Sequence, residues 1–173
     1  MSFWEESEIP CDLTIDYDGR LVNDDGTRVL LVAGSCRPVS GGNHVGGVAY
    51  FGGDLYRSYT TDQSPTITQQ RCVLLGIENA LERAEDMGLE DVVIQTHSES
   101  AVKSLTVHPD QWRCGDGIWR TTKRKEVKNQ DIMKRCLNLM EGMLAEVTWI
   151  RRHDNTIPCQ MAKAATYGNT ESD

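Results

Sequence analysis

Apolar residues cluster first into short runs that predict strands. The run at 28–33 (RVLLVA) ends at a Gly-Ser pair, as expected for a buried strand. Two further strands are predicted at 45–51 and 55–60, because they flank a Gly-Gly-Asp turn signal at 52–54. These three strands are expected to be antiparallel neighbours.

A helical spacing of apolar residues follows the third strand. Leu74, Ile77 and Leu81 recur at three- and four-residue intervals, which predicts a long amphipathic helix that closes at Gly88. The apolar run at 91–96 predicts a buried strand. Because a helix separates it from the first strand, this strand is expected to pair in parallel with it.

The second half of the chain alternates helices with one strand. The pattern predicts a short helix at 98–105, a loop at 109–117, a helix at 128–144, a strand at 146–151 and a closing helix at 156–167. Residues 1–27 are polar and are predicted to add at most a peripheral strand at 13–17. The tail at 169–173 is expected to be frayed.

Length and composition favour one globular domain. The 173 residues contain 39% hydrophobic and 25% charged side chains, which is ordinary for a folded protein. We assign residues 28–168 to this domain, residues 1–27 to an N-terminal extension and residues 169–173 to a C-terminal tail.

Three further features bear on surroundings and partners. No apolar stretch is long enough for a membrane span and the first residues do not resemble a signal peptide, so we expect no membrane partner and a cytoplasmic or nuclear location. The six cysteines lack a close pair and are expected to be buried free thiols. The net charge of -8 opposes general attraction to nucleic acid, so any such binding must be local. The one clearly basic run, at 120–128, is the candidate, although taken by itself it is interpreted as a solvated loop.

Five segments resemble motifs of the ribonuclease H type 1 domain, in the family's order. They are VAGSC at 32–36 (family TDGSC), TQQRCV at 68–73 (TNxRxE), THS at 96–98 (TDS), WRTTKRKEVKNQD at 119–131 (WKTxxxKxVKNxD) and WIRRHDNTIPCQMAK at 149–163. The last segment is most similar to the RxxNTEAD version of fungal relatives. The resemblance implies an α/β, RNase H-like fold: a five-stranded mixed sheet of three antiparallel and two parallel strands, flanked by helices.

The same resemblance implies an endoribonuclease that cuts RNA–DNA hybrids with two magnesium ions held by four carboxylates. The matching positions are Ala33, Val73, His97 and Cys159, none of which carries a carboxylate. Magnesium prefers such oxygen ligands. We therefore predict that the magnesium site is lost, that no cofactor is bound and that the chain is a pseudoenzyme.

Neighbouring side chains offer little replacement. Glu78 lies about 140° around the helix from Val73 and should face away, while Glu99 begins a helix and Asp154 lies in a loop beside His153. A zinc site formed by His97, Cys159 and Cys36 has three ligands at best, so a hydrogen-bonded imidazole and a packed thiol are the preferred interpretation.

Part of the family's nucleic-acid surface is retained. Thr68 and Asn129 match its phosphate pocket, Gln69 and Gln70 match positions that reach RNA 2′-hydroxyls, and Cys36 matches a backbone contact. The basic side chains expected to help are Lys123, Arg124, Lys125 and Lys128. The aromatic pair that cradles the DNA strand is replaced by Ser100 and His108, and Trp112 and Trp119 are interpreted as packing residues.

These observations lead to three functional hypotheses. The first is a catalytically inactive RNase H-like pseudoenzyme that binds RNA–DNA hybrid or duplex RNA weakly through the residual groove. The second is a protein-interaction scaffold whose acidic surface or residues 1–27 recruit a protein partner. The third is an RNase H that is active through relocated metal ligands.

Overall fold

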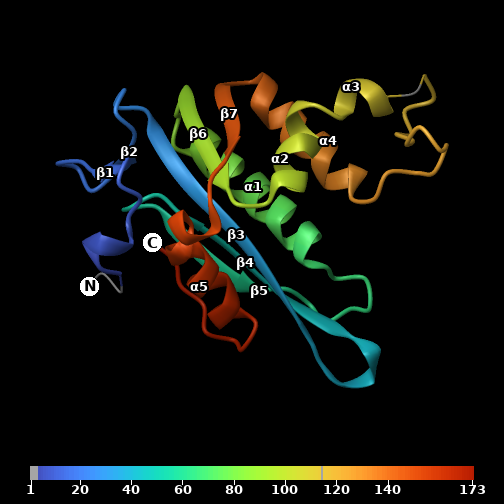
Figure 1. Cartoon of the computed structure of the whole chain (residues 1–173), viewed down its shortest axis with the longest axis horizontal. Helices are drawn as coiled ribbons and strands as arrows, with labels where there is room; N and C mark the ends of the chain where they lie inside the picture. The colour runs from blue at the N-terminus through green and yellow to red at the C-terminus, as the bar shows by residue number, and fades with distance from the viewer. Residues whose placement is uncertain (1–3, 114) are drawn as a thin grey trace.

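A computed structural model describes residues 4–113 and 115–173, which form a mixed sheet between layers of helices (Figure 1). Strands β3 (Arg28–Pro38), β4 (His44–Phe51) and β5 (Tyr56–Thr60) are antiparallel neighbours. Strand β6 (Asp91–Thr96) pairs in parallel with β3, and β7 (Leu144–Trp149) pairs in parallel with β6. The predicted α/β fold is confirmed.

Five α-helices are present in the described part of the chain. They are α1 (Gln69–Asp86), α2 (Glu99–Thr106), α3 (Pro109–Trp112), α4 (Gln130–Glu141) and α5 (Thr156–Ala165). Short 3-10 turns occur at Glu6–Glu8, Ser40–Gly42 and Arg152–Asp154. Figure 1 shows α5 on one face of the sheet and α1, with α2 and α4, on the other.

Several boundaries differ from the sequence prediction. The strand expected at 28–33 continues through the Gly-Ser pair to Pro38, because it pairs with β4 over that length. The helix expected to reach Leu144 ends at Glu141, where the N–H of Gly142 bonds the Leu139 carbonyl, and Leu144 already belongs to β7. The loop expected at 109–117 contains α3, because Pro109 begins a turn that the N–H of Arg113 closes onto its carbonyl.

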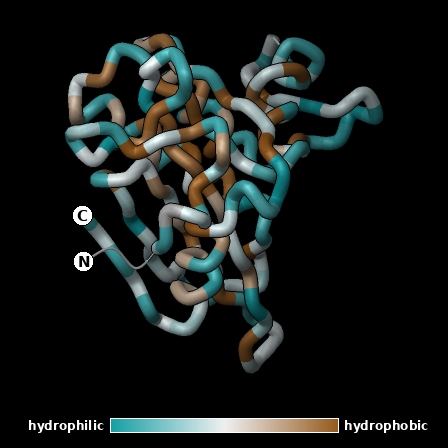
Figure 2. The backbone as a smooth tube through the Cα atoms, turned by 60° about the vertical axis from the view of Figure 1, so that its left-hand side comes forward, coloured by the Kyte–Doolittle hydropathy of each residue, from teal (hydrophilic) through white to brown (hydrophobic). Residues whose placement is uncertain are grey.

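Alternate side chains of β3 enter two separate cores, as the period of a strand requires. Leu30 and Val32 pack with α1, α2 and α4, whereas Leu31 and Ala33 pack with α5 and the N-terminal residues. Figure 2 shows the hydrophobic backbone segments gathered inside and hydrophilic segments around them (Figure 2). The sheet therefore fixes which β3 side chains can approach α5.

The N-terminal residues add two short strands to the predicted five. β1 (Thr14–Ile15) pairs with β2 (Leu21–Val22), and β2 pairs with β3, so the described sheet has seven strands. Leu21 is fully buried in the core on the α5 side. The peripheral strand expected at 13–17 is thus a two-residue strand joined to a second one, because Asp16 closes a tight turn between them.

The C-terminal residues are ordered along β5, so the expectation of a frayed tail is wrong. The N–H of Ser58 donates to the Glu171 carbonyl at 2.7 Å, and the Asp173 carboxylate pairs with Arg83 at 2.7 Å. The tail therefore covers the outer edge of the antiparallel strands.

The five described cysteines are free thiols, while Cys114 lies outside the described residues. Cys72 and Cys136 are buried, and burial raises the pKa of each thiol to about 12. Cys11 is exposed, so the expectation of burial is wrong for it. No helix in the described segments combines the length and apolar character needed to cross a membrane.

Candidate nucleic-acid interface

The four positions that lack the expected carboxylates lie on β3, on α1, directly after β6 and on α5. Ala33 is fully buried in the core on the α5 side, against which Cys159 also packs. Its neighbour Gly34 approaches α1 so closely that an ideal Cβ would lie 2.5 Å from the Val73 nitrogen. His97 follows the last residue of β6 and contacts Cys159. Ala33, His97 and Cys159 therefore lie around one centre, whereas the Val73 side chain packs in the core on the α1 side of the sheet.

A hydrogen-bonded group of neutral side chains occupies this degenerate centre. The fully buried Asn155 donates from Nδ2 to the Val32 carbonyl at 2.9 Å, and its Nδ2 also lies 2.9 Å from His97 Nδ1. Because Nδ2 is a donor, Nδ1 must accept, which places the imidazole proton on Nε2. Cys159 Sγ lies 3.7 Å from the same Nδ1.

Asn155 was not singled out by the sequence analysis, although it belongs to the loop motif quoted there. Its Oδ1 is buried without a hydrogen-bond partner among the residues that the structure describes, while both Nδ2 protons are used. The Trp149 indole N–H donates to the His97 carbonyl at 3.1 Å and holds the other end of this residue. The centre is thus fixed by polar contacts from β7 and from the turn before α5.

Burial keeps the two titratable side chains of the centre uncharged. It lowers the pKa of His97, with a further lowering from the nearby Arg152 guanidinium. Burial raises the pKa of the Cys159 thiol. Cys36, the third ligand considered for zinc, instead donates from Sγ to the Ile67 carbonyl at 3.5 Å. Within 4–113 and 115–173, no three His, Cys, Asp or Glu side chains are arranged to hold a metal ion.

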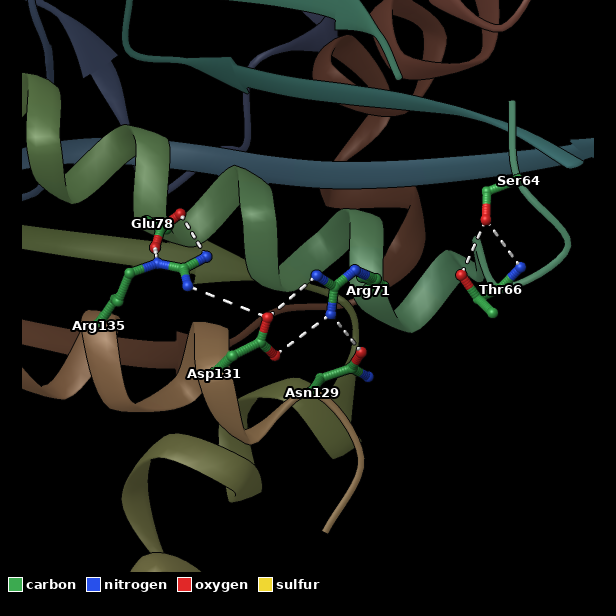
Figure 3. A network of polar contacts seen from close by, with 7 residues as sticks. All are labelled: Ser64, Thr66, Arg71, Glu78, Asn129, Asp131 and Arg135. Atoms are coloured by element: carbon green, nitrogen blue, oxygen red, sulfur yellow. Dashed lines mark hydrogen bonds and ion pairs between the residues drawn. The ribbon is translucent and has the colours of Figure 1, made fainter. Parts of the chain in front are cut away.

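The three carboxylates considered as replacements are engaged elsewhere. Glu78 of α1 forms an ion pair with Arg135 of α4 (Figure 3). Glu99 pairs with Lys103 at 2.9 Å within α2. Asp154 pairs with Arg151 at 3.0 Å.

The lowered pKa of His97 predicts a loss of stability in acid. Unfolded chains bind a proton on histidine below about pH 6.5, whereas the folded chain resists it, so stability is present above that pH and is lost as the pH falls through the folded pKa. We expect His97→Gln to flatten the pH dependence of the urea midpoint between about pH 7.5 and 5. His153→Gln, which removes an exposed imidazole from the neighbouring turn, is the control for the substitution itself. An equal slope in the natural chain and His97→Gln would contradict the assignment.

A polar cluster of side chains joins the starts of α1 and α4. Thr68 caps α1 by accepting from the Arg71 N–H at 3.1 Å. The Arg71 guanidinium donates to Asn129 Oδ1 at 3.1 Å and to both Asp131 oxygens, as Figure 3 shows. Asn129 adopts left-handed backbone angles, with φ of 62°, which turns the chain into α4. Thr68 therefore contacts the Arg71 backbone, and Asn129 contacts the guanidinium of the same residue.

Arg71 was part of a quoted motif but was not named as a binding residue. Its position between an amide and a carboxylate could have been inferred only from the packing of α1 on α4. Arg71 is the largest cause of the lowered pKa of Asp131, which therefore stays ionised and partly neutralises the arginine. A phosphate reaching this cluster would meet a guanidinium that Asn129 and Asp131 hold in place and whose charge Asp131 partly neutralises.

Further polar contacts lead from the start of α1 towards the degenerate centre, and together with the Arg71 cluster we call them the polar strip. Gln70 Oε1 accepts from Ser100 Oγ at 2.7 Å and from Ser98 Oγ at 3.3 Å, and Ser98 directly follows His97. Gln69 is exposed beside it at the first position of α1. Ser100, which replaces a family aromatic residue, therefore serves to orient Gln70.

The basic run forms an exposed loop between two buried residues. Trp119 and Val127 are in the core, and the Val127 N–H donates to the Trp119 carbonyl at 2.9 Å. Between these two residues, Lys123, Arg124 and Lys125 are exposed, and Lys128 is exposed immediately before Asn129. The interpretation of Trp119 as a packing residue is confirmed, and Trp112 packs against the same core and against the His108 ring at 4.9 Å.

Comparison with known proteins gives one consistent result. A family model described as RNase H matches residues 27–173. A ribonuclease H of Treponema pallidum is 29% identical over 86 residues, which is 50% of each chain. A ribonuclease H of Schizosaccharomyces pombe is 24% identical over 177 residues, which covers 99% of this chain and 60% of the relative. This chain therefore spans between half and three fifths of the length of these two relatives.

Solved structures show the same fold at low sequence identity. RNase H1 from Halobacterium salinarum aligns with a TM-score of 0.58 and 20% identity, over 82% of this chain and 98% of that chain. LC11-RNase H1 in complex with an RNA/DNA hybrid aligns with a TM-score of 0.57 and 15% identity, over 81% of this chain and 96% of that chain. The resemblance stated from the five motifs is confirmed.

Proposed function

Because this chain belongs to the RNase H family, we propose that it is a family member without nuclease activity that binds the backbone of an RNA–DNA hybrid or duplex RNA weakly. The observation that carries the proposal is the neutral group of His97, Asn155 and Cys159 at the point where the resemblance expects carboxylates. LC11-RNase H1, which shares this fold, has been solved in complex with an RNA/DNA hybrid, which supports the hybrid as the ligand to test first.

The donor atoms at the centre do not fit a pair of magnesium ions. Ala33 and Val73 supply hydrocarbon, and His97 and Cys159 supply an imidazole nitrogen and a thiol. Such ligands suit softer metals, whereas magnesium is held by oxygen anions. The chemistry of these side chains therefore supports the proposal that hydrolysis by two magnesium ions has been lost.

The remaining polar strip supports backbone binding. The Arg71 guanidinium, held by Asn129 near the start of α1, offers donors to a phosphate, and Gln70 is held on the same helix by Ser98 and Ser100. Removing carboxylates from the centre also removes charge that would repel a phosphodiester. Binding should be weak, because the protein carries a net charge of -8 and the two aromatic positions are Ser100 and His108.

Binding is tested by fluorescence anisotropy of a labelled RNA–DNA hybrid at increasing salt. We expect the affinity of the natural chain to fall steeply with salt, and Lys123→Glu with Lys125→Glu to weaken binding about tenfold or more at low salt. The matched control is Arg20→Glu with Arg57→Glu, which changes the net charge equally on the N-terminal and β5 side of the molecule. No binding at low salt, or an equal loss in both variants, would overturn this part of the proposal.

Cleavage is tested separately with the same hybrid in magnesium and in manganese. We expect no turnover by the natural chain. Turnover that disappears in Asp154→Asn would instead establish the third hypothesis, in which the metal ligands have been relocated.

A further inference from the structure

A hollow of about 570 Å³ lies at the end of the sheet opposite His97. Strands β6 and β7 begin there, and α1 and α4 end there, so the hollow is separated from the degenerate centre by the length of β6. Its lining residues include Glu85, Leu89, Glu90, Glu141, Met143 and Leu144. Together with Asp86, Met87 and Asp91, we call this region the acidic end patch.

The floor and margin of the acidic end patch are apolar. Leu144 is 74% exposed and Met87 is 48% exposed, whereas Leu89 and Met143 are partly buried against the core. The Leu144 N–H donates to the Glu90 carbonyl at 2.8 Å and so joins the start of β7 to the segment before β6. Apolar side chains gathered in a hollow with a polar rim are typical of interaction sites.

The rim is strongly negative. The segment 85–91 (EDMGLED) contains four acidic residues and no basic one, and Glu141 lies across the hollow. None of these five carboxylates forms an ion pair with another described residue, whereas the nearby Arg83 is paired with Asp173.

The placement of these charges works against folding. Glu85 and Asp86 end α1 and Glu141 ends α4, where the partial negative charge of a helix disfavours acidic side chains. The rim also repels phosphates and anionic membranes. Its charge is complementary to a cationic partner, and its hollow accepts an apolar side chain.

We propose that the acidic end patch binds a basic amphipathic segment of a partner protein, with an apolar side chain in the hollow and Lys or Arg side chains at the rim. This site is independent of the proposed nucleic-acid interface, because the two lie at opposite ends of β6. It gives the chain a second binding function that does not require the degenerate centre.

The probe is a synthetic amphipathic helical peptide of Lys and Leu, titrated into isotopically labelled protein and followed by NMR. We expect the largest amide shifts in 85–91 and 141–146. We expect Met87→Ser with Leu144→Ser, and separately Glu85→Gln with Glu90→Gln and Glu141→Gln, each to weaken binding about tenfold. The matched control is Asp24→Asn with Asp25→Asn and Asp62→Asn, which removes three exposed carboxylates elsewhere and should change affinity less than twofold.

Three outcomes would overturn the proposal. The first is equal weakening by the patch and control variants, which would mean attraction to net charge alone. The second is equal binding of a peptide in which Glu replaces Lys. The third is concentration-dependent self-association of the protein that Leu144→Ser abolishes, because the occupant would then be a second copy. Thermal unfolding checks that each variant is folded.

Discussion

Replacing the degenerate positions by carboxylates (Ala33→Asp, Val73→Glu, His97→Asp and Cys159→Asp) is expected to make stability depend on magnesium. Three of the new carboxylates would lie close together and the fourth would be buried at position 73, so repulsion and lost hydration should make the variant unfold more easily than the natural chain without a divalent ion. Binding of magnesium to the folded state alone should then raise the thermal midpoint by about 5–10 °C.

The measurement is calorimetry with and without magnesium. The natural chain should show no magnesium-dependent shift beyond that caused by equal ionic strength. A control with Ala33→Asn, Val73→Gln, His97→Asn and Cys159→Asn has similar side-chain volumes without charge and should also fail to respond. If the natural chain responds as strongly as the carboxylate variant, the proposed loss of the magnesium site is wrong.

Gly47→Ala is expected to be among the most damaging single substitutions in the protein. Gly47 lies on β4 where α5 crosses it, and an ideal Cβ would come 1.8 Å from the Ala162 carbonyl oxygen. The Cβ position is fixed by the β4 backbone and the oxygen belongs to the α5 backbone, so the clash can be removed only if α5 moves away from the sheet. We expect the free energy of unfolding to fall by at least about 3 kcal/mol.

Urea unfolding measures this effect, with Gly142→Ala as the matched control. Gly142 has right-handed helical angles, and its nearest neighbour to an added Cβ is an ordinary 3.6 Å contact with the Leu139 oxygen. Its effect should stay within about 0.5 kcal/mol. Comparable losses in the two variants would show that α5 can yield at Gly47.

The sequence predicts best the elements whose pattern and neighbours agree. Strand β6 has the predicted bounds, and α1 begins at the Thr68 cap and ends before Gly88, as its apolar spacing indicates. The boundary between α4 and β7 was misplaced because Met140, Met143 and Leu144 continue the helical spacing. Only the turn at Gly142 separates them.

Contacts between distant segments could not be read from local patterns. The order of the tail depends on its pairing with β5 and on the ion pair between Asp173 and Arg83, which joins residues 90 positions apart. The same reason explains why two residues of the candidate site were not predicted from the sequence. Arg71 acquires its role from Asn129 on another helix, and Asn155 from the Val32 carbonyl and His97.

The run of α1 and α4 has a consequence for how the whole molecule meets a polyanion. Both helices begin beside Arg71 and the basic loop and end at unpaired carboxylates, so their aligned peptide dipoles add to the side-chain charges. The protein therefore has a positive and a negative end, although its net charge is negative. In the field of a nucleic acid it would rotate during diffusion to lead with its Arg71 end, so that electrostatic torque selects the productive encounter.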